Sequence, residues 1–303
     1  MTDIYLITGF LGAGKTTLMK NLLAQFKNCK TAIIVNEFGR EGVDGALLEK
    51  EGMVIEEIVN GSIFCVCRSD KFIDAVIKTR TLDIDYLIIE ASGLADPFGM
   101  DEVMGIVNKI APDSFHYSGS ICVVDAKNYQ RVCQLAPAAK HQVQGADLLI
   151  INKIDTVTKN EITILEHALR DINSHAEIIS GSYGKLPEQE KLLSLEWHNF
   201  DRKNMIVKKT LGVSKLMYEF DDVPVEKLAE WLKTWSEKVY RIKGFCSKYC
   251  IQAVQNDVSF SEFPREKDEN FFVVLGTIND DLKNDIISSW KEFFHDSNLR
   301  LHK

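Results

Sequence analysis

Glycine, lysine and threonine near the N-terminus follow a spacing that suits the binding of phosphate groups. The run from Gly9 to Thr16 reads G-F-L-G-A-G-K-T and fits G-x-x-x-x-G-K-[S/T] in full. Glycines let backbone N–H groups close around phosphate oxygens, Lys15 reaches the β- and γ-phosphates, and the Thr16 hydroxyl is a Mg²⁺ ligand. The expected nucleotide-binding residues of this loop are Gly12, Ala13, Gly14, Lys15, Thr16 and Thr17.

A second polar cluster, Asn152-Lys153-Ile154-Asp155, directly follows an apolar run at 148–151. The Asp155 carboxylate can accept both the ring N–H and the exocyclic amino group of guanine. Adenine offers no such pair of donors, so it would leave the carboxylate unpaired. Open α/β sheets bind ligands at the carboxyl ends of their strands, where this cluster stands. We therefore predict that Asn152, Lys153 and Asp155 bind GTP or GDP and that Asp155 selects the guanine base.

A carboxylate also ends the apolar run at 86–89. Glu90 there can anchor the water shell of Mg²⁺, and the backbone N–H of Gly93 can approach a γ-phosphate. We therefore expect Thr16 and Glu90 to hold Mg²⁺ and Lys15 to act catalytically by stabilising charge.

These motifs need a scaffold of strands and helices, and the first part of the chain has that pattern. Amphipathic helices are expected from Lys15 and near 72–79, 99–110, 137–145 and 159–171. Strands are expected at 3–8, 31–35, 53–59, 86–89, 119–124, 148–151 and 177–179. Apolar strands that alternate with such helices predict an α/β fold with a mostly parallel sheet, here a P-loop domain over 1–185.

The pattern changes after residue 182, where a polar, poorly periodic connector begins and runs to 209. Later strands are expected at 215–220, 239–245, 249–255 and 271–275, and helices at 225–239 and 280–294. We predict a smaller α+β domain over 205–303.

Charge and composition exclude several classes of protein. The formal net charge of −8 argues against a nucleic-acid backbone as the main partner. No uncharged apolar stretch is long enough for a transmembrane helix, and the N-terminus lacks signal-peptide features, so we expect a cytosolic protein without a membrane partner. Seven cysteines, an odd number, do not suit a secreted disulfide framework. The oligomeric state is not indicated.

The three motifs together resemble those of the CobW-type GTPases. That family carries the loop GFLGAGKTT, a switch segment NEFG and a strand ending in E-x-x-G, found here at 9–17, 36–39 and 90–93. Val43-Asp44 also resembles its switch, and 241–245 resembles the R-x-K-G-[F/L] element of its C-terminal domain. The resemblance implies GTP hydrolysis coupled to delivery or maintenance of a metal or metallocofactor in a client protein. Glu37, in the switch, is the candidate catalytic residue for positioning water.

We expect slow unassisted hydrolysis, because no water-orienting glutamine follows Gly93 and no arginine finger is evident. A metal-free regulatory or assembly GTPase that acts on a protein partner is the alternative. A small-metabolite P-loop kinase is the third, and Asn152–Asp155 argues against it because such kinases more often use ATP.

The chain departs from the family at its cysteine motif, N-G-C-x-C-C. Ser62 and Phe64 replace the first two cysteines, Cys65 matches the third, and Cys67 is an extra thiol. Cys65 and Cys67 could form an open site for Zn²⁺ or Co²⁺, completed by Glu37, His116, water or a client, or they are two ordinary thiols. The pairs Cys122/Cys133 and Cys246/Cys250 are expected to be core residues or incidental thiols.

Overall fold

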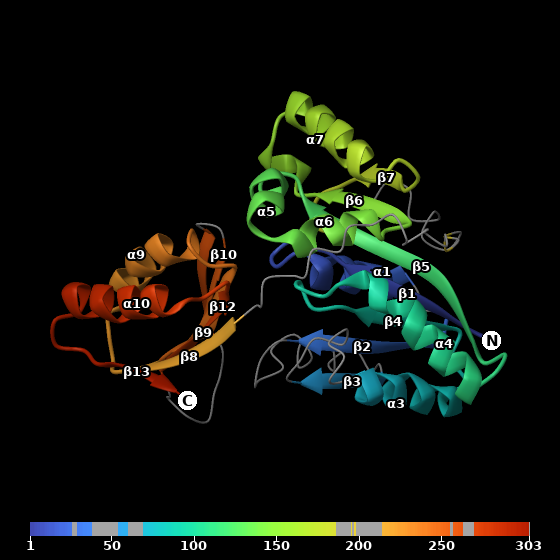
Figure 1. Ribbon diagram of the computed structural model, residues 1–303, viewed down its shortest axis with the longest axis horizontal. Coiled ribbons are helices and arrows are strands. Elements are labelled where there is room, and N and C mark those ends of the chain that lie inside the picture. Colours follow the sequence, from blue (N-terminus) through green and yellow to red (C-terminus); the bar gives the residue numbers. More distant parts are fainter. Residues whose placement is uncertain are drawn as a thin grey trace. The chain divides into compact units, whose positions relative to one another are not determined.

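The computed structural model divides the chain into two compact units, Met1–Met205 and Ile206–Lys303, and each is described by itself. It describes residues 1–25, 29–37, 54–59, 69–185, 195, 197, 214–254, 257–262 and 270–302. Figure 1 shows the helices and strands of both units.

The described strands of the first unit form one sheet of seven, in the order β3-β2-β4-β1-β5-β6-β7. Every neighbouring pair in it is parallel. The strands are β1 (Thr2–Thr8), β2 (Thr31–Glu37), β3 (Val54–Val59), β4 (Tyr86–Glu90), β5 (Phe115–Asp125), β6 (Leu148–Asn152) and β7 (Glu177–Ser180). The predicted α/β fold with a parallel sheet is confirmed.

Helices cover both faces of this sheet, which explains why its strands are apolar almost throughout. Ile4 and Leu6 of β1 belong to the core under α3 (Ser69–Thr79) and α4 (Met100–Ile110). Tyr5 and Ile7 alternate with them and pack with α1 (Lys15–Gln25) on the other face. Each fully buried side chain of this kind contributes about 1.5–3 kcal/mol.

The remaining helices of this unit are α5 (Tyr129–Leu135), α6 (Pro137–Gln144) and α7 (Lys159–Ile172), with short 3₁₀ turns η3 (Arg80–Leu82), η4 (Pro97–Gly99) and η5 (Ile154–Thr156). The predicted helices near 137–145 and 159–171 correspond to α6 and α7, whereas α5 was not predicted. A capping box starts α7, in which Thr158 and Glu161 satisfy each other's backbone N–H groups.

The chain leaves β1 and β4 in opposite directions. The helix after β1 lies on one face of the sheet, and the helix after β4 lies on the other. Neighbouring parallel strands with this arrangement leave a crevice at their carboxyl ends, which is where open α/β sheets bind ligands. The loop from Gly9 to Thr16, called the phosphate loop below, follows β1, and Glu90 ends β4. Both therefore lie at this crevice.

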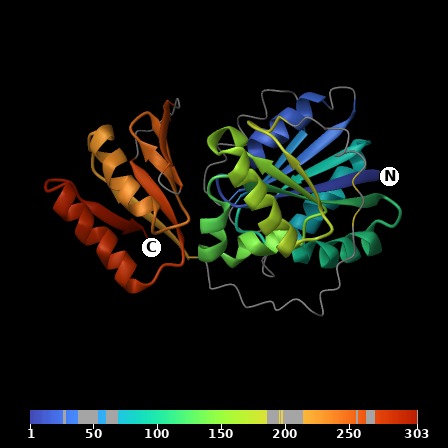
Figure 2. The same cartoon turned by 90° about the horizontal axis from the view of Figure 1, so that it is seen from above.

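The second unit contains a six-stranded antiparallel sheet in the order β11-β10-β9-β12-β8-β13. Its strands are β8 (Ser214–Phe220), β9 (Arg241–Cys246), β10 (Tyr249–Val254), β11 (Asp257–Glu262), β12 (Phe271–Gly276) and β13 (Leu299–His302). Two helices, α9 (Val225–Ser236) and α10 (Asp280–Phe293), lie side by side on one face of it (Figures 1 and 2).

Aromatic side chains fill the space between this sheet and its two helices. Trp231 meets Trp290 edge to face, with ring centroids 5.0 Å apart, and Phe272 from β12 lies against both. All three are buried. The predicted strands and helices of this region are present, and β11 and β13 are additional. Among the described residues no helix is both long enough and apolar enough to cross a membrane.

Candidate nucleotide-binding site

The phosphate loop is held close to the sheet by its glycines. Gly9 has φ 132°, and a Cβ there would lie 2.3 Å from the carbonyl oxygen of Val123 in β5. Gly14 has φ 102°, and a Cβ there would meet the Asn152 amide at the same distance. Both the backbone conformation and the space therefore require glycine at these two positions.

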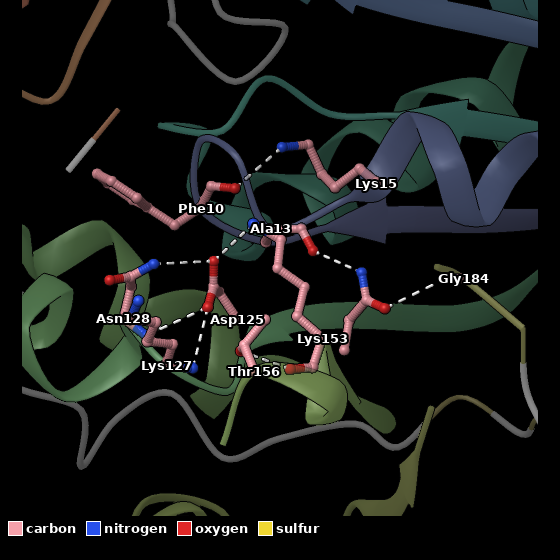
Figure 3. A network of polar contacts seen from close by, with 10 residues as sticks. Phe10, Ala13, Lys15, Asp125, Lys127, Asn128, Lys153, Thr156 and Gly184 are labelled. Carbon is pink, nitrogen blue, oxygen red and sulfur yellow. Dashed lines mark hydrogen bonds and ion pairs between the residues drawn. The ribbon is translucent and has the colours of Figure 1, made fainter. Parts of the chain in front are cut away.

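Lys15 is buried, and its ammonium group contacts the backbone of the phosphate loop. Its Nζ donates hydrogen bonds to the carbonyl oxygens of Gly9 at 2.9 Å and Phe10 at 3.3 Å. Figure 3 shows its side chain turned toward Phe10 above the loop. A cation held against neutral carbonyls at the start of α1 suits a site that receives negatively charged oxygens.

Thr16 and Glu90 meet at the crevice between β1 and β4. The Thr16 hydroxyl lies 3.0 Å from one carboxylate oxygen of Glu90 and 3.3 Å from the other, and Glu90 is buried. A hydroxyl and a carboxylate are hard oxygen donors of the kind that Mg²⁺ prefers. This pair, which lies 74 residues apart in sequence, therefore fits the predicted magnesium site.

Gly93 packs directly on the phosphate loop. A Cβ there would lie 2.6 Å from the backbone nitrogen of Leu11 and 2.6 Å from its Cδ2. Only a glycine lets the backbone after Glu90 approach the loop this closely. Gly93, which is predicted to approach the γ-phosphate, therefore lies next to the phosphate loop.

Asn152 is buried and links two loops. Its Nδ2 donates to the carbonyl oxygen of Ala13 at 2.9 Å, and its Oδ1 accepts from the backbone N–H of Gly184 at 3.2 Å. The first contact ties β6 to the phosphate loop, and the second ties it to the turn after β7. Asn152 thus positions the loops on both sides of it.

Lys153, the residue after β6, has φ 64°, a left-handed backbone conformation. Its Nζ lies 2.8 Å from a carboxylate oxygen of Asp125, at the end of β5. The Asp125 carboxylate also accepts the backbone N–H groups of Lys127 and Asn128, and Figure 3 shows these groups converging on it. Asp125 was not predicted, although it ends an apolar strand in the same way as Glu90 does.

Asp155 is exposed at the sheet edge, beside Ser182. The Ser182 hydroxyl hydrogen-bonds the Asp155 carboxylate and lowers the pKa of that carboxyl below its usual value. It also accepts the backbone N–H of Asp155 at 3.2 Å. Ser182 thereby favours the ionised form, the state that accepts two guanine donors.

The turn that carries Ser182 was also missed by sequence reasoning. It is anchored on α1, because Asn21 Nδ2 donates to the Tyr183 carbonyl at 2.6 Å. Gly184 has φ 68°, and a Cβ there would lie 2.7 Å from the Cα of Leu18. The signal in the sequence was the run S-Y-G-K, which begins at Ser182, two residues after the end of β7.

Several predicted residues are not placed by the structure. Cys65 and Cys67 lie outside the described residues, as do Phe38, Gly39 and the Val43-Asp44 pair. Glu37 ends β2 at the same sheet edge as the phosphate loop, but its side chain is not described.

His116 lies away from the nucleotide site, and its suggested role in completing a metal site with Cys65 and Cys67 stays a prediction, because both cysteines lie outside the described residues. It pairs with Asp3 at the amino-terminal start of β1 and β5, with its Nδ1 2.8 Å from the Asp3 carboxylate.

The other cysteine pairs suit the core, as predicted, apart from half-buried Cys133. Burial raises the pKa of Cys122 to about 12, so its thiol stays protonated. Within the described residues, no group of three or more His, Cys, Asp or Glu side chains could hold a metal ion.

Curated proteins with known names are similar to this chain in sequence. The chain is 31% identical over 189 residues to the zinc chaperone YjiA of Escherichia coli, covering 60% of this chain and 58% of that one. It is 28% identical over 202 residues to zinc-regulated GTPase metalloprotein activator 1 of Schizosaccharomyces pombe, covering 64% and 49%. The chain thus spans about half the length of the curated relatives it matches.

The crystal structure of Zn(II)-bound YjiA GTPase from Escherichia coli is similar over 96% of this chain and 98% of that one, with 22% identity and a TM-score of 0.47. The family model "CobW/HypB/UreG, nucleotide-binding domain" matches residues 3–180. This match covers more than half of the chain, and the chain therefore belongs to the CobW/HypB/UreG family.

Proposed function

We propose that the chain is a Mg²⁺-dependent GTP hydrolase that couples its nucleotide cycle to delivery or maintenance of zinc or another transition metal in a client protein. One observation supports this most strongly. Groups suited to phosphate, Mg²⁺ and guanine come from β1, β4 and β6 and stand at one edge of one sheet. The names of the relatives, zinc chaperones and a zinc-regulated GTPase, support the link to metal.

Base selection falls to Asp155, supported by Ser182. An ionised carboxylate would accept both donors of guanine, and it would face no such pair on adenine. The ion pair with Asp125 fixes the ammonium of Lys153 at the end of β5, and Asn152 fixes the phosphate loop. Base and phosphate subsites are therefore coupled through β6.

Phosphoryl transfer depends on positioning and on charge stabilisation. Lys15 would exchange its two carbonyl partners for phosphate oxygens, and the N–H groups at the start of α1 would add positive potential. Thr16 and Glu90 would hold Mg²⁺, which neutralises charge on phosphate oxygens when bound. Glu37, at the end of β2 next to β4, is the candidate for orienting the attacking water.

Hydrolysis is tested by measuring phosphate release from GTP. Wild-type protein should turn over slowly, at about 10⁻⁴ to 10⁻² s⁻¹ without an activator. Lys15→Ala should abolish measurable turnover, whereas Lys20→Ala, a half-buried lysine on the same helix, should leave it unchanged. Equal turnover in the Lys15→Ala protein and in wild type would contradict the assignment.

The metal cargo is tested separately, because the cysteine segment is distinct from the nucleotide site in sequence. Zn²⁺ and Co²⁺ are titrated into GDP-bound and GTP-analogue-bound protein by calorimetry, with Cys65→Ser/Cys67→Ser as the variant. We expect the variant to lose binding, and we expect nucleotide to change metal affinity by the same factor that metal changes nucleotide affinity. Unchanged metal binding in the variant would instead favour a metal-free GTPase switch acting on a protein partner.

A further inference from the structure

Helix α6 lies against the segment that follows Glu90. A Cβ on Gly145, just after α6, would come within 2.9 Å of Pro97 and 3.1 Å of Phe98. The His141 Nδ1 lies 3.3 Å from a carboxylate oxygen of Asp96. The same helix thus contacts this segment at several places.

Gln142 makes the most specific of these contacts. It is fully buried, and its Nε2 donates to the carbonyl oxygens of Gly93 at 3.2 Å and Ala95 at 3.0 Å. Two carbonyl acceptors fix the orientation of the amide, because the opposite orientation would place Oε1 against both of them. Gln142 therefore bridges the two ends of a short turn, in which Ala95 N–H donates to the Ser92 carbonyl at 3.0 Å.

This orientation leaves the other half of the amide unsatisfied. Gln142 Oε1 is buried, and no donor in the described part of the chain reaches it. Buried acceptors are nearly always paired, so an unpaired one in a native protein calls for an explanation. A side chain chosen only for packing would avoid this cost, since methionine fills a similar volume without a polar atom. The two donated hydrogen bonds to the turn are the feature that requires glutamine.

The turn matters because of what lies on its other side. Gly93 packs on the backbone of Leu11 in the phosphate loop, while its carbonyl is held by Gln142. A γ-phosphate is the only part of the nucleotide that distinguishes GTP from GDP, and it is the part that Gly93 is predicted to approach. A residue that orders Gly93 therefore acts on GTP and leaves the contacts to GDP unchanged.

We propose that Gln142 is a positioning residue that holds the Gly93–Ala95 turn ready for the γ-phosphate and so sets the preference of this site for GTP over GDP. The inference rests on the proposed function, and it adds an element, α6, through which the triphosphate state is read. Helix α6 would then also be the place where a change in this turn is passed to the rest of the domain.

The test is calorimetric titration of GDP and of the non-hydrolysable analogue β,γ-imido-GTP into wild type, Gln142→Met and Gln144→Met. Methionine removes the donors and the unpaired acceptor together at nearly constant volume, so the variant should fold. Gln144, half-buried on the same helix, is the matched control. We expect Gln142→Met to weaken the analogue by about tenfold, as for the loss of one to two hydrogen bonds, with GDP affinity unchanged.

Equal losses for both nucleotides would make Gln142 merely structural, and no loss for either would remove its role; both results overturn the proposal. If Gln142→Met does not fold, Asp96→Asn probes the same segment from its contact with His141, and an unchanged analogue-to-GDP affinity ratio there rejects the proposal. If wild type binds neither guanine nucleotide, the proposed function itself fails, which is distinct from a change in ratio.

Discussion

Replacing Asn152 with alanine should both destabilise the first unit and weaken the binding of GDP. The change removes two hydrogen bonds, to the Ala13 carbonyl and from the Gly184 N–H, and leaves both backbone groups buried without these partners. A hydrogen bond contributes about 0.5–1.5 kcal/mol net, and each buried group left unsatisfied costs about 1–3 kcal/mol. We expect a loss of about 2–4 kcal/mol in the stability of the first unit.

GDP affinity should fall as well, because Asn152 fixes the carbonyl of the phosphate loop. A misplacement of about 1 Å in such a loop can cost about 100-fold. We therefore expect a loss of about 10- to 100-fold in GDP affinity, measured by calorimetry well below the melting temperature of the variant.

Asn173→Ala is the matched control, because Asn173 is an equally buried amide in the same unit. Its Nδ2 donates to the carbonyls of Val143 and Ala146, both at 2.8 Å, and its Oδ1 accepts from Ala176 N–H at 2.9 Å. It should destabilise the unit at least as much without changing GDP affinity. Wild-type GDP affinity in Asn152→Ala, or an equal loss in Asn173→Ala, would refute this reasoning.

Three further changes probe the turn after β7, the base site and the second unit. Gly184→Ala should destabilise the turn and weaken nucleotide binding, because the new Cβ would meet the Leu18 backbone at 2.7 Å; a wild-type melting temperature would contradict this. Ser182→Ala should raise the folded pKa of Asp155. Because only the ionised carboxylate accepts both guanine donors, GDP binding is lost as pH falls through the folded pKa of Asp155, so the variant should lose GDP at a higher pH than wild type. An unchanged acid limb in a pH titration would count against Ser182. Ser289→Ala removes the acceptor shared by two buried indole N–H groups at 2.7 and 2.9 Å. It should destabilise the second unit by about 2 kcal/mol or more, seen by tryptophan fluorescence, with GDP binding unchanged.

The scaffold was predictable where each element carries its own signal. β1, β4 and β6 are apolar runs followed by polar motifs, so both the strands and their functional ends could be read locally. Elements without such a signal were missed. α5 spans only seven residues, β13 spans four, and β11 has mostly exposed and half-buried side chains, D-V-S-F-S-E, because it pairs at the edge of its sheet.

The candidate site also contains some residues that could be predicted from a short stretch of sequence and others that could not. The phosphate loop and the Asn152–Asp155 cluster are contiguous in sequence, so their chemistry is visible in a short window. Asp125 and Ser182 depend on pairing across the sheet instead. Asp125 meets Lys153 because β5 and β6 align Asp125 with Asn152, and Ser182 meets Asp155 because β7 ends beside β6. No local pattern encodes that register.

Direct competition between GDP and ADP for the wild-type site tests the central claim, that this sheet edge selects guanine through Asp155. The account predicts that GDP binds at least about 100-fold more tightly than ADP. It also predicts that Asp155→Asn weakens GDP and partly restores binding with xanthosine diphosphate, whose altered ring matches the amide. Equal affinity of the wild-type protein for GDP and ADP, or unchanged GDP binding in Asp155→Asn, would contradict it.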